Sequence, residues 1–272
     1  MQYIKITCSV ISQDASDMLM ARLSAAGYNG FEEQENKLLA YIEVPKFLED
    51  ELKEITGTYA VTYETEIIPS QNWNALWESN FEPVVVDGFC TIRAHFHEME
   101  VTTPYDIVLT PKMSFGTGHH ATTQLMMMMM RGLELSGKSV LDFGTGTGVL
   151  AILAEMLGAK DVLAIDNDEW SVENAIENID RNHCTRIKVQ LGSLDALLPG
   201  ENDVILANIN RHILLEYMQQ LYQILINNGF ILMSGLLKED QEIIANAAIS
   251  FGFHLVRVNE QLNWIALLFE KK

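Results

Sequence analysis

Hydrophobic and polar residues in the first part of the chain alternate with two different periods. Runs with a period of two predict strands, and runs with apolar residues three and four positions apart predict helices. Their order, β-α-β-β-α-β, predicts a small ferredoxin-like α+β domain over residues 1–66. Its carboxylates are scattered along exposed faces, so we expect a recognition or docking domain. The expected strands cover residues 3–10, 30–33, 37–44 and 59–67, and the expected helices cover 14–26 and 45–55.

A connector follows over residues 67–83. It holds Trp73, Trp77 and Phe81, each four residues after the last, and this spacing places the three rings on one face of a short helix. Large aromatic side chains at helical spacing are more often packed in a core than stacked on a ligand, so we interpret the stripe as packing. Residues 67–83 are therefore expected to be a linker.

From Val84 onward, strand and helix patterns alternate over longer stretches. This alternation predicts an α/β domain over residues 84–272 with an open, mostly parallel sheet. The last two strands are separated by a short turn, so the sheet should finish with an antiparallel strand. The expected strands cover residues 84–86, 89–97, 106–110, 140–143, 161–166, 187–191, 203–208, 229–234, 254–259 and 264–270, and the expected helices cover 122–135, 149–154, 169–182, 214–225 and 239–250.

One strand of this domain runs into a glycine-rich turn with Gly144, Gly146 and Gly148. Glycine tolerates positive φ and a close ligand, and the following helix offers free N–H groups, so this corner is predicted to bind a nucleotide. The dinucleotide fingerprint G-x-G-x-x-G needs a glycine where this sequence has Val149. Asp142 disfavours a pyrophosphate and suits a ligand with an ammonium group, such as S-adenosylmethionine. A dehydrogenase remains the alternative if Val149 is tolerated.

Polar residues end two further strands of the predicted sheet. Asp166 ends the second, 22 residues after Gly144, where an acid accepts hydrogen bonds from both ribose hydroxyls. Asn208 ends the fourth, at the edge where ligands bind, and its amide oxygen would orient a nucleophilic amine toward a methyl group. The alternative for Asn208 is a turn-forming residue. Asp195 either meets the adenine amine or caps the next helix, and both remain open.

Three other motifs receive structural interpretations. Residues 132–139 match the phosphate-loop pattern GxxxxGK[ST], but a helix precedes them and a strand follows, the reverse of the order that brings helix N–H groups to phosphates. His95 and His97 share a face of a predicted strand without an acid or cysteine cluster, so no metal is expected. The run Met126–Met130 makes its helix nearly all apolar and is interpreted as flexible core filler.

Composition narrows the class of partner. The 272 residues carry 18 basic and 37 acidic side chains, a net charge of −19 that repels a phosphate backbone and attracts a basic protein. No direct nucleic-acid partner is therefore expected, although an acidic surface also serves solubility alone. No apolar run reaches the roughly 18 residues of a membrane span, the N-terminus lacks a signal-peptide pattern, and three distant cysteines suit a reducing compartment. We expect a cytoplasmic protein without a membrane partner.

Three segments together resemble the ribosomal protein methyltransferase A family, bacterial enzymes that methylate protein eleven of the large ribosomal subunit. The loop Phe115-Gly-Thr-Gly-His-His-Ala-Thr-Thr123 is similar to the family's FGTGTHPTT, residues 142–148 to its DFGCGSG, and residues 207–209 to its ANIL. The resemblance covers most of the chain. It implies a ferredoxin-like substrate-recognition domain, a short linker and a class I methyltransferase domain with a Rossmann-like sheet, which the terminal hairpin also favours over a dehydrogenase sheet.

The resemblance also implies site residues. S-adenosylmethionine would be contacted at Thr123 in the loop, Gly144 in the glycine corner, Asp166 at the ribose and Asn208 beside the methyl group. The expected cofactor site is completed by Phe115, Gly146 and Asp142. The departures from the family's residues are His119, Ala121, Asn210 and Arg211. They lie near the substrate side and leave open which amines are methylated and how many times.

The implied reaction is a methyl transfer from a sulfonium to neutral amines, lysine side chains and an N-terminal amine, of ribosomal protein eleven. Asn208 would orient the amine, and the sequence offers no evident general base. The alternatives are a methyltransferase of another protein, an RNA or a small molecule, and a non-catalytic docking protein that binds the cofactor. The two-domain layout argues against a small molecule, and the charge argues against RNA. We expect a monomer.

Overall fold

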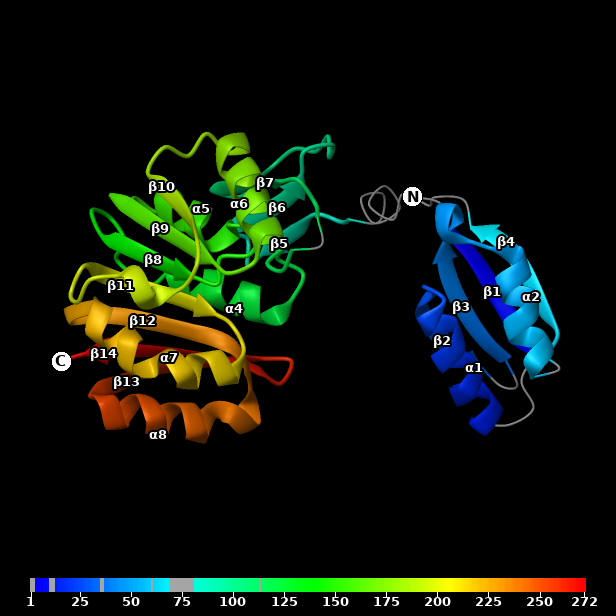
Figure 1. The fold of residues 1–272 in the computed structure, drawn as a ribbon. Helices are drawn as coiled ribbons and strands as arrows, with labels where there is room; N and C mark the ends of the chain where they lie inside the picture. Colours follow the sequence, from blue (N-terminus) through cyan, green and yellow to red (C-terminus); the bar gives the residue numbers. More distant parts are fainter. Residues whose placement is uncertain (1–2, 10–12, 35–36, 60, 69–80, 113) are drawn as a thin grey trace. The chain divides into compact units, whose positions relative to one another are not determined.

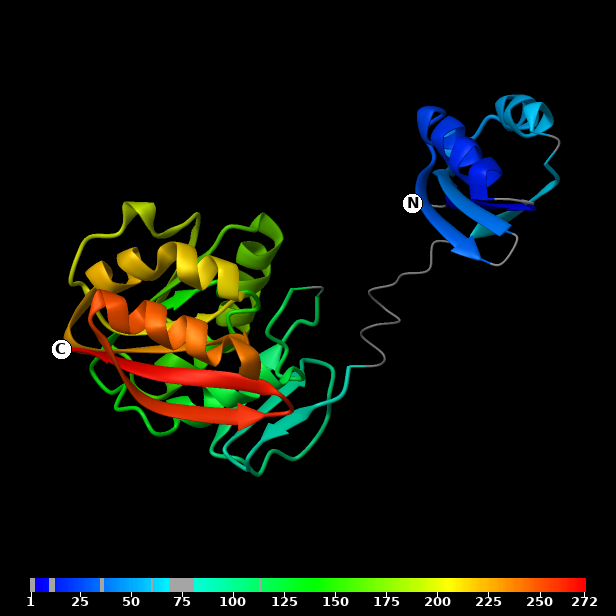
Figure 2. The ribbon, with the colours of Figure 1, turned by 90° about the horizontal axis from the view of Figure 1, so that it is seen from below.

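The computed structural model describes residues 3–9, 13–34, 37–59, 61–68, 81–112 and 114–272. The chain forms two compact units, Met1–Leu76 and Trp77–Lys272 (Figure 1 and Figure 2). Two aromatics of the predicted stripe, Trp73 and Trp77, lie outside the described residues. Phe81 is 5% exposed and packs against His97 and His119, so the packing predicted for it is confirmed.

The N-terminal unit has the predicted order β-α-β-β-α-β. Its elements are β1 (Tyr3–Ser9), α1 (Gln13–Ala25), β2 (Asn29–Gln34), β3 (Lys37–Glu43), the short 3₁₀ helix η1 (Val44–Lys46), α2 (Glu49–Thr58) and β4 (Tyr63–Ile68). The four strands form an antiparallel sheet in the order β2-β3-β1-β4. Ile4, Ile6 and Cys8 alternate into a core with Leu19 and Leu23 of α1, as a period of two requires when one face of a strand is buried.

The second helix of this unit starts and ends later than the sequence predicted. Residues 45 and 46 belong to the short 3₁₀ helix η1, and α2 begins only at Glu49, where three acids in its first turn complement the helix dipole. The hydroxyl of Thr56 donates to the carbonyl of Leu52 at 2.8 Å, which lets a β-branched residue continue the helix. The strand expected from Tyr59 therefore begins at Tyr63.

The C-terminal unit holds a seven-stranded sheet and a three-stranded one. Its elements are β5 (Val84–Val86), β6 (Cys90–Ala94), β7 (Tyr105–Leu109), α4 (Ala121–Met130), β8 (Ser139–Phe143), α5 (Val149–Met156), β9 (Asp161–Asp166), α6 (Glu169–Arg181), β10 (Ile187–Leu191), η2 (Leu194–Ala196), β11 (Asn202–Asn208), α7 (Arg211–Ile224), β12 (Leu225–Leu237), η3 (Lys238–Asp240), α8 (Gln241–Phe251), β13 (Phe253–Gln261) and β14 (Trp264–Lys271). The large sheet has the order β10-β9-β8-β11-β12-β14-β13. Its last strand in sequence, β14, lies between β12 and β13 and is antiparallel to both, so the predicted α/β sheet with a terminal antiparallel hairpin is confirmed.

Helices cover both faces of the large sheet. α4, α5 and α6 lie on one face, and α7 and α8 lie on the other (Figure 1). Alternation along β8 sends Val140 to the first face and Leu141 to the second. Met126 and Met130 of α4 are fully buried against the first face, which confirms the methionine run as core filler. α4 ends at Met130, five residues earlier than predicted.

The observed elements settle the interpretation of two motifs, the phosphate-loop pattern at residues 132–139 and the histidine pair His95 and His97. Gly132 lies in the turn after α4 and Ser139 opens β8, so the segment has a helix before it and a strand after it, as predicted, and is no phosphate loop. The strand face predicted for His95 and His97 is wrong. β6 ends at Ala94, and the Ala94 N–H donates to Nδ1 of His97 at 3.1 Å, which turns the chain.

No group of three or more His, Cys, Asp or Glu suited to a metal ion lies in the described part of the chain. Among the same residues, no helix is long and apolar enough to cross a membrane. Cys8, Cys90 and Cys184 are free thiols.

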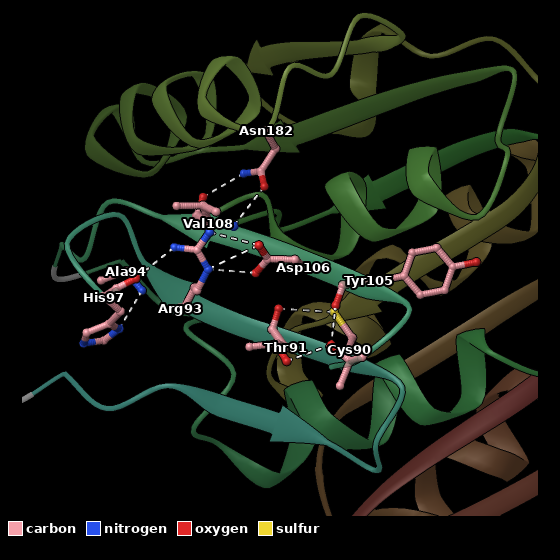
Figure 3. Close-up of polar contacts among 10 residues, drawn as sticks. Cys90, Thr91, Arg93, Ala94, His97, Tyr105, Asp106, Val108 and Asn182 are labelled. Atoms are coloured by element: carbon pink, nitrogen blue, oxygen red, sulfur yellow. Dashed lines mark hydrogen bonds and ion pairs between the residues drawn. The ribbon is translucent and has the colours of Figure 1, made fainter. Parts of the chain in front are cut away.

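The smaller sheet has the order β5-β6-β7, with β6 and β7 parallel. Arg93 on β6 forms an ion pair with Asp106 on β7, with Nη2 and Oδ2 3.0 Å apart (Figure 3). Beyond β7, the side chain of Asn182 accepts from the Val108 N–H at 2.9 Å and donates to the Val108 carbonyl at 2.7 Å. The end of α6 is thereby fastened to the free side of β7.

Two asparagines within α6 extend the contact made by Asn182, which caps the C-terminal end of the helix. Asn178 accepts from the Thr110 N–H at 2.7 Å, and Asn174 donates to the Thr110 carbonyl at 3.2 Å. Asn174, Asn178 and Asn182 are four residues apart, so they share one face of the helix. They form an asparagine ladder along the edge of β7.

Candidate functional site

The glycine corner at the end of β8 is built by close backbone contacts. Gly144 and Gly146 have φ values of +75° and +54°, in the left-handed region that favours glycine. A Cβ on Gly144 would lie 2.3 Å from a methyl carbon of Ile209, and one on Gly146 would lie 2.3 Å from the carbonyl oxygen of Phe115. The corner therefore admits no side chain at either position.

The loop before α4 is fastened to this corner through Thr147. The Thr147 N–H donates to the Phe115 carbonyl at 2.9 Å, and its hydroxyl donates to the Gly116 carbonyl at 2.7 Å. The Thr147 carbonyl in turn accepts from Nδ2 of Asn178 at 2.8 Å. Two segments about 30 residues apart thus hold one fixed arrangement beside the sheet edge.

Asp166 ends β9 next to the glycine corner. One of its carboxylate oxygens accepts from the Gly146 N–H at 2.8 Å and the other from the Asp168 N–H at 3.1 Å. Each oxygen of a carboxylate has a further acceptor site, so a ligand with two neighbouring hydroxyls can still be bound. The same side chain fixes the turn and faces the cavity described below.

Asn208 ends β11 and is 8% exposed. Its Nδ2 donates to the hydroxyl of Thr123, in the first turn of α4, at 3.4 Å. Its Oδ1 is buried and has no hydrogen-bond partner in the described part of the chain. An unpaired buried acceptor is costly, so this oxygen is suited to an N–H donor of a bound molecule.

Asp142 is buried beneath the corner. It is 1% exposed and accepts from the hydroxyl of Thr145 at 2.6 Å. Burial raises its pKa to about 7, against the lowering effect of the Thr145 hydrogen bond. Strand alternation explains this position, because Asp142 shares the face of Val140 that packs beneath α4 and α5.

A cavity of about 720 Å³ opens at the carboxyl ends of β8, β9 and β11. Five of the seven predicted cofactor residues line it: Phe115, Gly144, Gly146, Asp166 and Asn208. Thr123 and Asp142 do not line it; both are buried directly behind its wall. A cavity of this size suits a nucleoside with an amino-acid tail.

The sequence interpretation missed most of the other cavity residues, including three with large ring side chains. His120, Tyr217 and Trp264 line the wall. His120 stands inside the loop that carries the resemblance, so its position was open to prediction. Trp264 comes from β14, and only the pairing of the terminal hairpin brings it there. For Asp195 the sequence left two roles open, contact with the adenine and capping of a helix. Asp195 is exposed, accepts a hydrogen bond from Gln220 at 3.1 Å and does not line the cavity. The N-cap of η2 is Ser193.

Three of the departures from the family's residues have structural partners. Asn210 caps α7 by accepting from the Ile213 N–H at 3.1 Å. Arg211 forms an ion pair with Asp240 at 2.6 Å. The His119 ring stands edge-on to Phe81, 4.9 Å away.

Sheet order and glycine corner together define the class of this protein: it has the Rossmann-like fold of a class I methyltransferase. Residues 5–272 match the family described as Ribosomal protein L11 methyltransferase (PrmA), and the chain belongs to that family. The predicted resemblance is thereby confirmed.

Two named relatives are similar in sequence to this chain over nearly its whole length. A Ribosomal protein L11 methyltransferase of Bacteroides fragilis is 40% identical over 279 residues, which cover 99% of each chain. One of Porphyromonas gingivalis is 39% identical over 264 residues, 94% of this chain and 91% of the relative. A crystal structure of ribosomal protein L11 methylase from Lactobacillus delbrueckii subsp. bulgaricus superposes with a TM-score of 0.64 at 32% identity, covering 71% of this chain and 100% of that one.

Proposed function

We propose that this protein transfers methyl groups from S-adenosylmethionine to amines of ribosomal protein L11, both lysine side chains and the N-terminal amine. Family membership and the relatives' names support the acceptor. The observation that carries the chemistry is the unpartnered, buried Oδ1 of Asn208 at the carboxyl end of β11, beside the glycine corner.

The residues around the cavity fit the cofactor, which supplies a methyl group already activated on a sulfonium. Gly144 and Gly146 line the cavity with backbone alone, and the close contacts with Ile209 and Phe115 hold that backbone in position. Asp166, held by two N–H groups, keeps acceptor sites for the ribose hydroxyls. Thr123 does not line the cavity, and it contributes by accepting the hydrogen bond that orients the Asn208 amide. Asp142 supports the turn from below through Thr145.

Asn208 acts by orientation. Because Nδ2 donates to Thr123, the opposite atom of the amide, Oδ1, is left as an acceptor for an N–H of the incoming amine. That hydrogen bond would aim the nitrogen lone pair at the methyl group and contribute through positioning. The amine must lose a proton, and we propose that the proton leaves to solvent.

We also propose a substrate-recognition role for the small domain predicted over residues 1–66, joined by the linker 67–83 to the domain over 84–272. Residues 1–66 carry 12 acidic and 5 basic side chains, so this part of the chain is acidic like the whole. Such a surface attracts a basic protein. Because the proposed substrate is a ribosomal protein, we propose that the reaction takes place in the cytoplasm. We also propose that the protein is a monomer, with the substrate-recognition domain and the methyltransferase domain on one chain.

The test is transfer of a labelled methyl group from S-adenosylmethionine to purified ribosomal protein L11. We expect Asn208→Ala to lower turnover far more than cofactor affinity, because the amide oxygen meets the amine. Asn202→Ala is the matched control, since Asn202 stands at the opposite end of β11 and donates to the Ile224 carbonyl at 3.3 Å. Equal loss of turnover and affinity in Asn208→Ala would refute the orienting role. Label on RNA or another protein, with none on L11, would refute the acceptor.

A further inference from the structure

The histidine pair His95 and His97 belongs to a group of five rings that has no role in the proposed reaction. Both histidines stand edge-on to Phe96, at centroid distances of 5.2 Å and 4.8 Å. His97 also stacks on Phe81 at 6.0 Å, and Phe81 stands edge-on to His119 at 4.9 Å. We call these five residues the ring cluster. It joins the end of the predicted linker, the turn after β6 and the loop before α4.

Both loops of the ring cluster are held against the small sheet. The Arg93 guanidinium donates to the His97 carbonyl at 3.2 Å, which fixes the turn after β6 (Figure 3). The loop before α4 packs closely on the same strand, because a Cβ on Gly118 would lie 2.3 Å from Cδ1 of Ile92. The next residue of that loop, His119, is therefore kept in the ring cluster.

The ring cluster has a buried base and an exposed top. Phe81 is 5% exposed, whereas Phe96 is 40% exposed, and His95 and His119 are exposed. Met99, in the same loop as Phe96, is also 40% exposed. Single exposed apolar side chains are common, but here two large ones share a short loop with packed rings. Such a surface is suited to contact with another molecule.

The charges of this surface are negative. Glu98 and Glu100 are exposed and form no ion pair within the ranges that the structure describes. Residues 94–104 contain no lysine or arginine, and Arg93 before them is already paired with Asp106. Apolar side chains bordered by unpaired carboxylates fit lysine and arginine side chains, whose stems are apolar and whose ends are cationic. The surface therefore complements a basic protein.

The same surface adjoins the cavity. His119 belongs to the ring cluster, and the next residue, His120, caps α4 and lines the cavity. Phe115, earlier in the same loop, lines the cavity and is 52% exposed. The loop before α4 thus contributes to the cavity wall and to the ring cluster. A protein chain that brings an amine into the cavity is within reach of both.

We propose that the ring cluster, together with Met99, Glu98 and Glu100, is a docking surface for a cationic segment of the protein substrate near the amine to be methylated. The stems of lysine or arginine side chains pack on Phe96 and Met99, and their charged ends meet the ring face of Phe96 and the two carboxylates. This inference rests on the proposed function. It gives the C-terminal domain its own part in substrate recognition, besides the part proposed for residues 1–66.

The test compares Phe96→Ala with Ile249→Ala in methyl transfer to L11. Ile249 is the matched control, because it is 54% exposed and lies near the end of α8, on the other face of the large sheet. We expect Phe96→Ala to raise KM for L11 about 5-fold or more, as truncation of an aromatic anchor does. Its kcat and its affinity for S-adenosylmethionine should stay unchanged, because Phe96 does not line the cavity.

Three results would count against the docking surface. An unchanged KM for L11 in Phe96→Ala, or an equal increase in Ile249→Ala, would overturn it and leave the proposed function standing. Weaker binding of S-adenosylmethionine in Phe96→Ala would show that the ring cluster supports the cofactor loop instead. Absence of transfer to L11 by the native protein would overturn the proposed function and this inference with it.

A second variant tests the charge of the bound segment. Glu98→Gln combined with Glu100→Gln removes both carboxylates and keeps their shape, so KM for L11 should rise at low salt and depend less on salt than in the native protein. The control combines Glu201→Gln with Glu270→Gln, at the opposite edge of the large sheet, and should behave like the native protein. Native KM and salt dependence in the first variant would overturn the cationic segment as the occupant.

Discussion

Replacing Gly146 by alanine tests the close contact between the glycine corner and the loop before α4. At φ +54° an alanine costs about 1–2 kcal/mol relative to its preferred conformations. Its Cβ would lie 2.3 Å from the Phe115 carbonyl oxygen, so the loop must move. That movement breaks the hydrogen bond from Thr147 to Phe115, which is worth about 1 kcal/mol.

Gly137→Ala is the matched control. Gly137 has φ +71°, but no atom lies within 4 Å of a Cβ placed there, so only the conformational cost applies. We therefore expect Gly146→Ala to lower the free energy of unfolding by about 2–3 kcal/mol and Gly137→Ala by about 1–2 kcal/mol. Binding of S-adenosylhomocysteine should weaken in Gly146→Ala and stay unchanged in Gly137→Ala.

The assay is urea unfolding followed by tryptophan fluorescence, with calorimetry for binding. None of the four tryptophans lies in the first 66 residues, so the fluorescence signal does not come from the N-terminal domain. If the two variants had the same stability and the same affinity for S-adenosylhomocysteine, the close approach at Gly146 would play no part in the site.

Three further predictions follow from single contacts. Burial raises the pKa of Asp142 to about 7, so between about pH 4 and about pH 7 the folded state keeps a proton that the unfolded state loses, and stability falls as pH rises through this range. The Asp142→Asn side chain does not ionise. In chemical denaturation, the stability of this variant relative to the native protein should therefore be higher at about pH 8 than at about pH 5. Thr147→Val removes the hydroxyl donor to Gly116 and should cost about 1 kcal/mol and raise KM for the cofactor; an unchanged KM would show that the hydroxyl does not hold the loop. Asn182→Ala leaves two main-chain groups of β7 unpaired and should cost about 2 kcal/mol, with faster hydrogen exchange at Val108; unchanged exchange would contradict the contact.

The elements of the C-terminal domain were open to prediction because their patterns are local. β9 and β10 begin and end at the predicted residues, since β9 is a short apolar run bounded by Asp161 and Asp166, and β10 alternates apolar and polar residues. β12 was predicted over 229–234 and is observed over Leu225–Leu237. Its extra length comes from pairing with β11 and β14, and a sequence pattern does not carry long-range pairing.

The site was predictable where its residues end strands, and less so elsewhere. Asp166 and Asn208 were placed correctly at the sheet edge, because parallel strands bring their carboxyl ends together. Asp142 was expected to meet the ligand and is found buried beneath the turn, where strand alternation places it. His120 was missed because histidine is not a common N-cap, and Trp264 because no nearby residue signals its position.

The asparagine ladder of α6 has a consequence for solubility. A strand at the end of a sheet presents unpaired N–H and C=O groups that invite a strand from another molecule. At Val108 on β7 and at Thr110 just beyond its end, these groups are already taken by amide side chains, which offer the same donor and acceptor pair as a peptide group. The helix thus acts as a strand-mimicking cover, and the three-stranded sheet is protected from self-association on that side without the addition of a fourth strand.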